Sequence, residues 1–257
     1  MKIKKINYCN ILKAVTFFLS FVLIISCTKD KKIDTSNLNP NAGDINSTSN
    51  TDTTDTGKIT YLALGDSYTI GESVSEQERF PVQLVNLLQK NNVNIEHPDI
   101  VAVTGWTTGN LLNTLNNKPP KDNYSFVTLL IGVNNQYQGR SLEEYKTEFS
   151  QLLHMAIAFA GNKKDHVFVL SIPDYSVTRF ARNLDTAKIA KEIDVFNEAN
   201  RLISQNVGVN YLDITPISRD AKNDASLIAS DGLHPSSEQY LKWDQLLEPL
   251  VLKMIKK

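Results

Sequence analysis

Residues 59–67 read ITYLALGDS, a short and nearly continuous apolar run that stops at a glycine and continues with an aspartate and a serine. An apolar run of this length, bounded by a turn residue, is typical of a β-strand. In open α/β sheets, ligands bind beyond the carboxyl ends of the strands. The stretch therefore predicts a strand followed by Ser67, whose hydroxyl group would lie at the carboxyl edge of the sheet, where an α/β protein binds its ligand.

Further along the chain, the same alternation of strand and helix patterns continues to the last residues. Short apolar runs typical of strands occupy residues 59–64, 100–103, 126–131, 167–172 and 209–214. Segments with helical spacing of apolar side chains or a helix-start signal lie between and after them, near residues 80–88, 111–115, 141–159, 187–206 and 238–255. Strands that alternate with helices predict a mainly parallel sheet covered on both faces, which is a three-layer α/β/α sandwich.

Polar clusters follow the strand runs. They are residues 65–68, 104–106, 132–135 and, shortly after the fifth strand, 231–234. Because the carboxyl ends of parallel strands share one edge of the sheet, we expect all four clusters to meet there.

Three side chains in these clusters can form a nucleophilic system. A serine hydroxyl attacks carbonyl groups poorly unless a base takes its proton, so Ser67 requires a partner such as His234. Asp231 precedes His234 by three residues, a spacing that lets its carboxylate accept a hydrogen bond from one imidazole nitrogen while the other faces Ser67. Each residue also has a structural interpretation: a turn serine, a helix-capping aspartate and a surface histidine.

The four clusters, in their order along the chain, resemble the motifs of the GDSL or SGNH hydrolase family over nearly all of residues 58–257. The resemblance implies the family's flavodoxin-like α/β/α fold with a five-stranded sheet, and a triad of Ser67, His234 and Asp231. It also implies an oxyanion hole built from the backbone N–H groups of Ser67 and Gly105 and the side-chain amide of Asn134.

One position departs from the family pattern. Asn135 stands where the family usually has an aspartate, which puts in doubt whatever that carboxylate does; loop support is our interpretation. Tyr68, Trp106 and Tyr137 lie next to the motifs, where they either line a substrate cleft or pack in the core.

The first 26 residues have the pattern of a secretory signal. Four lysines at positions 2, 4, 5 and 13 precede an uncharged, mostly apolar run from Ala14 to Ser26, which is too short to span a bilayer as a helix. The run ends in Ile24-Ile25-Ser26-Cys27, which resembles the lipobox of bacterial lipoproteins. The resemblance implies cleavage before Cys27 and lipidation of its sulfur. A cleaved signal with a chance cysteine, or an uncleaved anchor, are the alternatives.

Residues 27–57 form the next predicted region. From Thr28 to Gly57, 20 of 30 residues are Thr, Ser, Asn or Asp, so the segment cannot bury enough apolar surface to offset its ordering entropy. We interpret it as a flexible spacer behind the lipidated cysteine, with residues 58–257 as the hydrolase domain. The predicted location is extracytoplasmic, anchored by lipid to a bacterial membrane; a weak likeness of residues 29–32 to surface-export signals favours the outer membrane or cell surface.

Composition excludes several classes of function. A net charge of −1, which becomes −5 once the four signal lysines are removed, gives no electrostatic case for a nucleic-acid partner. Two cysteines cannot build a disulfide scaffold or a cysteine-based zinc site. The three histidines outside the motifs, His97, His154 and His166, lack metal-ligand spacing. We therefore expect neither metal nor cofactor.

Two function hypotheses remain. The first is a membrane-tethered serine esterase that hydrolyses carboxylic esters, of lipid or acetylated-glycan type, through an acyl-enzyme. The second is a non-catalytic lipoprotein that binds glycan or lipid on the same fold; the presence of Ser67, Asp231 and His234 together argues against it. A nucleotide-binding module is disfavoured because no glycine-rich phosphate loop follows the first strand. Acyl length and alcohol partner depend on segments such as 68–79 and 173–187, which we expect to be loops. No motif encodes them, nor the oligomeric state.

Overall fold

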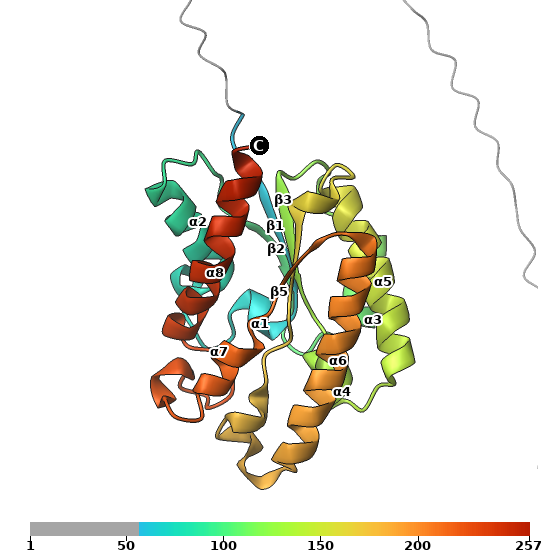
Figure 1. The fold of residues 1–257 in the computed structure, drawn as a ribbon, viewed down its shortest axis with the longest axis vertical. Helices are drawn as coiled ribbons and strands as arrows, with labels where there is room; N and C mark the ends of the chain where they lie inside the picture. Colours follow the sequence, from blue (N-terminus) through green and yellow to red (C-terminus); the bar gives the residue numbers. More distant parts are fainter. Residues whose placement is uncertain (1–56) are drawn as a thin grey trace, which may run out of the picture. The chain divides into compact units, whose positions relative to one another are not determined.

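The computed structural model describes residues 57–257, which form a five-stranded sheet between two layers of helices (Figure 1). The strands are β1 (Tyr61–Gly65), β2 (Asp99–Ala102), β3 (Phe126–Leu130), β4 (Val167–Leu170) and β5 (Asn210–Leu212). Their order is β2-β1-β3-β4-β5 and every neighbouring pair is parallel, which confirms the predicted fold class. The predicted signal segment, Cys27 and most of the spacer lie outside the described residues, so these predictions and the proposed domain boundary stay predictions.

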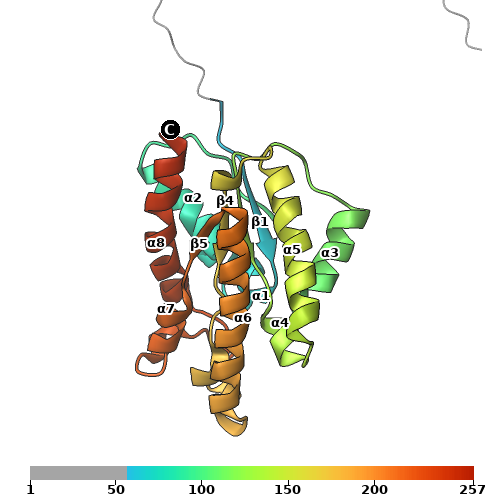
Figure 2. The ribbon, with the colours of Figure 1, turned by 45° about the vertical axis from the view of Figure 1, so that its right-hand side comes forward.

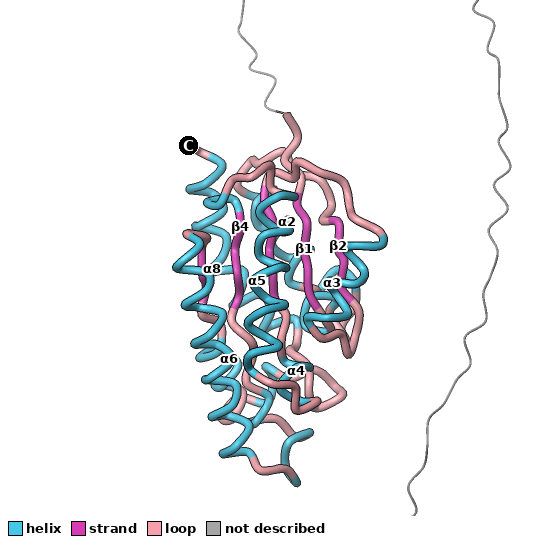
Figure 3. Tube along the Cα trace, turned by 90° about the vertical axis from the view of Figure 1, so that its right-hand side faces the viewer, coloured by secondary structure: helices cyan, strands magenta, loops and turns pink. Residues whose placement is uncertain are grey.

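Two groups of helices cover the two faces of the sheet. One face carries α2 (Phe80–Lys90) and α8 (Ser237–Ile255), with α7 (Thr215–Asp220) beside α8. The other carries α3 (Thr108–Asn117), α5 (Leu142–Phe159) and α6 (Thr186–Val207). Figure 1 shows α2 and α8 on one side of the strands and α3, α5 and α6 on the other, Figure 2 brings α6 in front of the strands, and Figure 3 looks onto the face covered by α5 and α6.

Burial explains why β1, β3 and β4 read as continuous apolar runs. Every residue of these three strands is buried, since they occupy the middle of the sheet with helices on both sides. The outer strands β2 and β5 are mostly half-buried, and their sequence runs are correspondingly less apolar. The α8 layer contributes Trp243 and Tyr240, both fully buried, which pack edge to face at 4.9 Å between ring centroids.

Helix ends follow local capping rules. Ser141 accepts a hydrogen bond from the backbone N–H of Glu144 at the start of α5, as its position before an acidic turn predicts. Ser236 caps α8 in the same way, and Asp185 caps α6.

The sequence did not indicate the short helices at the carboxyl edge of the sheet. These are α1 (Ser67–Ile70), α4 (Val133–Tyr137) and the 3₁₀ turns η1 (Glu76–Glu78), η3 (Tyr175–Val177), η4 (Phe180–Asn183) and η5 (Ala225–Leu227); a further 3₁₀ turn, η2 (Lys164–His166), directly precedes β4. Segments 68–79 and 173–187, expected to be loops, therefore contain short ordered turns, and several of these turns carry residues of the candidate site.

Candidate active site

The turn between β1 and α1 places Ser67 at the edge of the sheet. Asp66 is the N-cap of α1, and its Oδ1 accepts a hydrogen bond of 3.0 Å from the backbone N–H of Tyr68. Gly65 makes the turn possible, because a Cβ atom there would overlap the hydroxyl of Thr69 and the carbonyl oxygen of Leu130. Ser67 is thus the first residue of a helix whose entry angle is fixed by close packing.

Asp66 itself faces the protein interior. Only 1% of the residue is exposed, and its Oδ2 has no hydrogen-bond partner among residues 57–257. Burial raises the pKa of this carboxyl from 3.8 to about 7, although hydrogen bonds from backbone N–H groups, including that of Tyr68, oppose the shift. Asp66 does not line the cleft, and its bond to Tyr68 gives it a supporting role in the turn.

Asp231 and His234 form a tightly hydrogen-bonded pair before α8. The distance between His234 Nδ1 and Asp231 Oδ2 is 2.6 Å, and Asp231 Oδ1 accepts the backbone N–H groups of Leu233 and His234 at 2.9 and 3.0 Å. Partial burial would raise the pKa of Asp231, but hydrogen bonds, above all that from His234, outweigh it and lower the pKa to about 2. The carboxylate therefore stays ionised at neutral pH and holds the imidazole by Nδ1, and no hydrogen bond from residues 57–257 engages Nε2.

Ser73 completes the hydrogen bonding of Asp231. Its hydroxyl donates to Asp231 Oδ2 at 2.7 Å, across 158 residues of sequence. Ser73 has a φ of +66°, a left-handed conformation that is uncommon for residues other than glycine. Sequence reasoning missed this residue, since a lone serine in a loop carries no motif.

The two remaining motif segments bring N–H groups to the same place. Gly105 lines the cleft and has a φ of +85°, a left-handed backbone conformation that favours glycine, and no atom lies within 4 Å of where a Cβ would stand. Asn134, on α4, donates one amide hydrogen to the carbonyl oxygen of Trp106 at 2.9 Å. That bond leaves the second amide hydrogen of Asn134 for a ligand and ties α4 to the Gly105 loop.

Asn135 performs the loop support expected at this position. It is fully buried; its Oδ1 accepts the backbone N–H of Thr108 at 3.0 Å, and its Nδ2 donates to the Thr108 hydroxyl at 2.7 Å. An amide can both accept and donate here, which a carboxylate cannot do when ionised. The Thr108 hydroxyl in turn donates a hydrogen bond to Glu148 on α5. The asparagine therefore fastens the start of α3, directly after the Gly105 loop.

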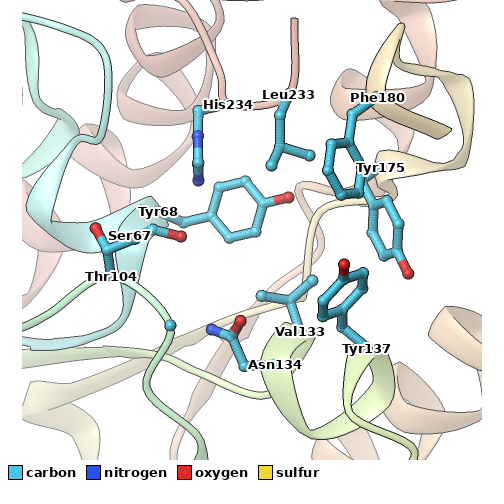
Figure 4. Close-up of a pocket in the computed structure, with 11 residues that line it drawn as sticks. Ser67, Tyr68, Thr104, Val133, Asn134, Tyr137, Tyr175, Phe180, Leu233 and His234 are labelled. Carbon is cyan, nitrogen blue, oxygen red and sulfur yellow. The ribbon is translucent and has the colours of Figure 1, made fainter. Parts of the chain in front are cut away.

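One cleft of about 160 Å³ is lined by a residue from each of the four motif segments, Ser67, Gly105, Asn134 and His234. Figure 4 shows Ser67 and His234 on one side of it and Asn134 below them. Among residues 57–257 no hydrogen bond joins Ser67 to His234, in keeping with unliganded hydrolases, in which such bonds are often long. Tyr68 and Tyr137 also line the cleft, whereas Trp106 packs against the core and contributes its carbonyl oxygen.

Within the described part of the chain, no group of three His, Cys, Asp or Glu side chains could hold a metal ion. None of the helices in residues 57–257 combines the length and apolar character that a membrane crossing requires.

The fold and the cleft define a parallel α/β protein with a serine and a histidine in a cleft at the carboxyl edge of its sheet. The model of the GDSL-like Lipase/Acylhydrolase family matches residues 63–242, so the chain belongs to this family. The resemblance drawn from the motifs is thereby confirmed for the family and for its ester-hydrolase class; the catalytic roles of individual residues stay predictions.

Solved structures share the fold at low identity. The family 3 carbohydrate esterase of Clostridium thermocellum has a TM-score of 0.62 and 21% identity, covering 78% of this chain and 98% of its own. TesA has a TM-score of 0.59 and 15% identity, covering 76% of this chain and 99% of its own. Axe2, an acetylxylan esterase from Geobacillus stearothermophilus, has a TM-score of 0.56 and 19% identity, covering 78% of this chain and 95% of its own. No curated protein matches the sequence.

Proposed function

We propose that the chain is a serine esterase that cleaves carboxylic esters through an acyl-enzyme on Ser67. The observation that carries the proposal is the 2.6 Å bond between Asp231 and His234, formed in the same cleft as Ser67 and the Gly105 and Asn134 donors. A site that only binds ligand has no need of an ionised carboxylate that orients an imidazole toward a hydroxyl group.

Acylation follows from these positions. His234 Nε2 takes the proton of Ser67 as the hydroxyl oxygen attacks the ester carbonyl, and Asp231 stabilises the imidazolium that results. The imidazolium then gives its proton to the departing alcohol. Water enters, loses a proton to His234 and attacks the acyl carbonyl. The bond from the acyl carbon to Ser67 Oγ then breaks, the imidazolium returns its proton to Ser67, and the acid leaves.

The negative oxygen of each tetrahedral intermediate needs donors that are already in place. The backbone N–H groups of Ser67 and Gly105 and the second amide hydrogen of Asn134 are the proposed donors. Preorganised donors of this kind avoid the cost of reorganisation during the reaction, and losing one typically costs about 10²–10³ in turnover.

The proposed substrates are uncharged esters of the acetylated-glycan or lipid type, met outside the cytoplasm. The carbohydrate and acetylxylan esterases of the same fold support the first type, and the predicted lipid anchor at Cys27 is compatible with both. Several acyl chains on one cysteine would hold the enzyme firmly on a membrane.

Hydrolysis of p-nitrophenyl acetate and butyrate by the full chain tests the proposal, with Ser67→Ala as the comparison. We expect release of p-nitrophenol by the parent and almost none by the variant. Equal rates in the two proteins would favour the non-catalytic binding lipoprotein instead.

The anchor is tested separately. Intact-mass analysis of protein from bacterial membranes should show a lipid mass on the peptide that begins at Cys27, and Cys27→Ser should release the protein from the membrane fraction. An unmodified Cys27 would end the lipoprotein prediction without affecting the esterase.

A further inference from the structure

Three aromatic side chains form the end of the cleft farthest from Ser67 and His234. They are Tyr137 on α4, Tyr175 on η3 and Phe180 on η4, and we call them the aromatic wall. Each pair of ring centroids lies 6.0–6.2 Å apart, with interplanar angles of 53–74°. These values are typical of edge-to-face packing, so the rings make one continuous surface.

Folding does not account for the exposure of this surface. Tyr137 is 54% exposed and Phe180 is 43% exposed, while Tyr175 beneath them is buried. Tyr175 is also fixed by a polar chain, because its hydroxyl donates to Gln136 and Gln136 donates to Glu192, at 2.9 and 2.7 Å. Two large rings held on a rigid support beside a catalytic cleft mark a binding surface.

The wall is continuous with the catalytic groups. Figure 4 shows the ring of Tyr68 lying between Ser67 on one side and the aromatic wall on the other. Val133 and Leu233 complete the lining between the two ends. An ester whose carbonyl lies at Ser67 therefore extends one of its halves over an apolar path to Tyr137 and Phe180.

Charge and space define what that half of the ester must be. His234 apart, the lining contains no side chain that can carry charge near neutral pH, so nothing there would form an ion pair with a phosphate, a carboxylate or an ammonium group. An aromatic face can attract a cation, but no carboxylate lines the cleft to balance its charge. The whole cleft, catalytic end included, has a volume of about 160 Å³, close to the about 150 Å³ of an apolar cavity that holds one benzene molecule. A long acyl chain would leave most of its length outside.

We propose that the aromatic wall binds the flat face of a single six-membered ring carried by an uncharged ester, and so sets the substrate preference of the enzyme. The inference rests on the proposed esterase function. An arene and a pyranose share this chemistry, since both present an apolar face of similar size to an aromatic side chain.

The test compares three acetate esters by the rate of acetate release. Ethyl acetate has no ring, phenyl acetate carries an arene, and a monoacetylated methyl β-xylopyranoside carries a sugar ring. Each variant is made in the full chain. The double alanine variant, Tyr137→Ala with Phe180→Ala, removes both exposed rings. The conservative pair, Tyr137→Phe with Phe180→Tyr, keeps both rings, and Leu202→Ala is the control. Leu202 is 44% exposed on α6 and does not line the cleft. The ratio of variant to parent kcat/KM within each ester removes the differences in leaving-group reactivity.

We expect the double alanine variant to lose at least about fivefold in kcat/KM on a ring-bearing ester, because two ring contacts of about 0.5–1.5 kcal/mol each convert at about 1.36 kcal/mol per tenfold. Ethyl acetate should change by less than about twofold, and the conservative pair and Leu202→Ala should stay near the parent. A loss on phenyl acetate alone supports the wall with an aryl ester as the source of the ring, and a loss on the xyloside alone supports it with an acetylated sugar. Equal losses on all three esters, or none, would overturn the inference.

Failure of the proposed function gives a different pattern. If the parent releases acetate from none of the esters, binding of phenyl acetate and of the acetylated xyloside is followed by saturation-transfer NMR instead. Signal for either ester in the parent that vanishes in the double alanine variant still supports the wall; signal that persists in the variant for every ester that binds, or that the parent shows for neither, overturns it.

Discussion

Replacing Asp231 with asparagine separates orientation of the imidazole from every other feature of the site. In Asp231→Asn the new side-chain amide would keep an oxygen to accept the backbone N–H groups of Leu233 and His234, as Asp231 Oδ1 does at 2.9 and 3.0 Å. At the position of Oδ2, however, an NH₂ group would face His234 Nδ1. The imidazole would have to turn Nδ1 into an acceptor, which puts its hydrogen on Nε2 and removes the base that Ser67 needs.

The expected effect is large in rate and small in stability. A wrong tautomer in a serine triad lowers kcat by about 10⁴, which corresponds to about 5.4 kcal/mol of transition-state stabilisation. Ser73→Ala removes only one neutral donor from the same carboxylate and should cost about 2- to 13-fold, from about 0.5–1.5 kcal/mol for one hydrogen bond. The two variants therefore differ by about three orders of magnitude although they touch the same oxygen.

Steady-state kinetics on p-nitrophenyl acetate and urea unfolding of each variant give the comparison. Asp224→Asn is the matched control, because Asp224 is also a loop carboxylate that accepts a backbone N–H, from Ser226 at 3.0 Å, and it does not line the cleft. The control should retain parental activity. More than a tenth of parental activity in a folded Asp231→Asn variant would refute the orientation argument.

Other changes follow from the same structure. Asn134→Ala should lower kcat by about 10²–10³ with little change in KM, because its amide is proposed to meet the oxyanion only; an unchanged kcat would remove it from the oxyanion hole. Gly65→Ala should destabilise the protein by about 1–3 kcal/mol or more, because the new methyl group overlaps Thr69 and the Leu130 carbonyl; chemical denaturation at parental midpoint would contradict this. Burial raises the pKa of Asp66 to about 7, so between pH 4 and 7 the folded state keeps a proton that the unfolded chain has lost. The contribution of Asp66 to the free energy of unfolding should therefore fall as pH rises from 4 to 8. The fall amounts to up to about 4 kcal/mol, because the pKa difference between 3.8 and about 7 converts at about 1.36 kcal/mol per unit. Asp66→Asn should flatten this pH dependence.

Periodicity and position predicted most of the architecture. The buried runs of β1, β3 and β4 and the long amphipathic helices carry strong local signals, since the apolar spacing repeats over many residues. The positions of the polar clusters after those strands were sufficient to predict that they meet. One cleft is indeed lined by Ser67, Gly105, Asn134 and His234.

Features that depend on contacts between distant segments left no local signal. Ser73 reaches Asp231 across 158 residues, and a single serine in a loop cannot indicate that. Helices of three to six residues, such as α1 and α4, are too short to show a repeat, so the ordered turns that carry Tyr175 and Phe180 were expected as loops. The aromatic wall is visible only once those turns are placed beside α4.

Active-site labelling of Ser67 tests the central claim most directly. The full chain is treated with a fluorophosphonate, which reacts with serines that a neighbouring base activates, and the modified peptide is identified by mass spectrometry. We predict one phosphonyl adduct on Ser67 in the parent, strongly reduced labelling in His234→Ala and none in Ser67→Ala. A parent that stays unlabelled, or an adduct on a different serine, would contradict the assignment of Ser67 as the nucleophile.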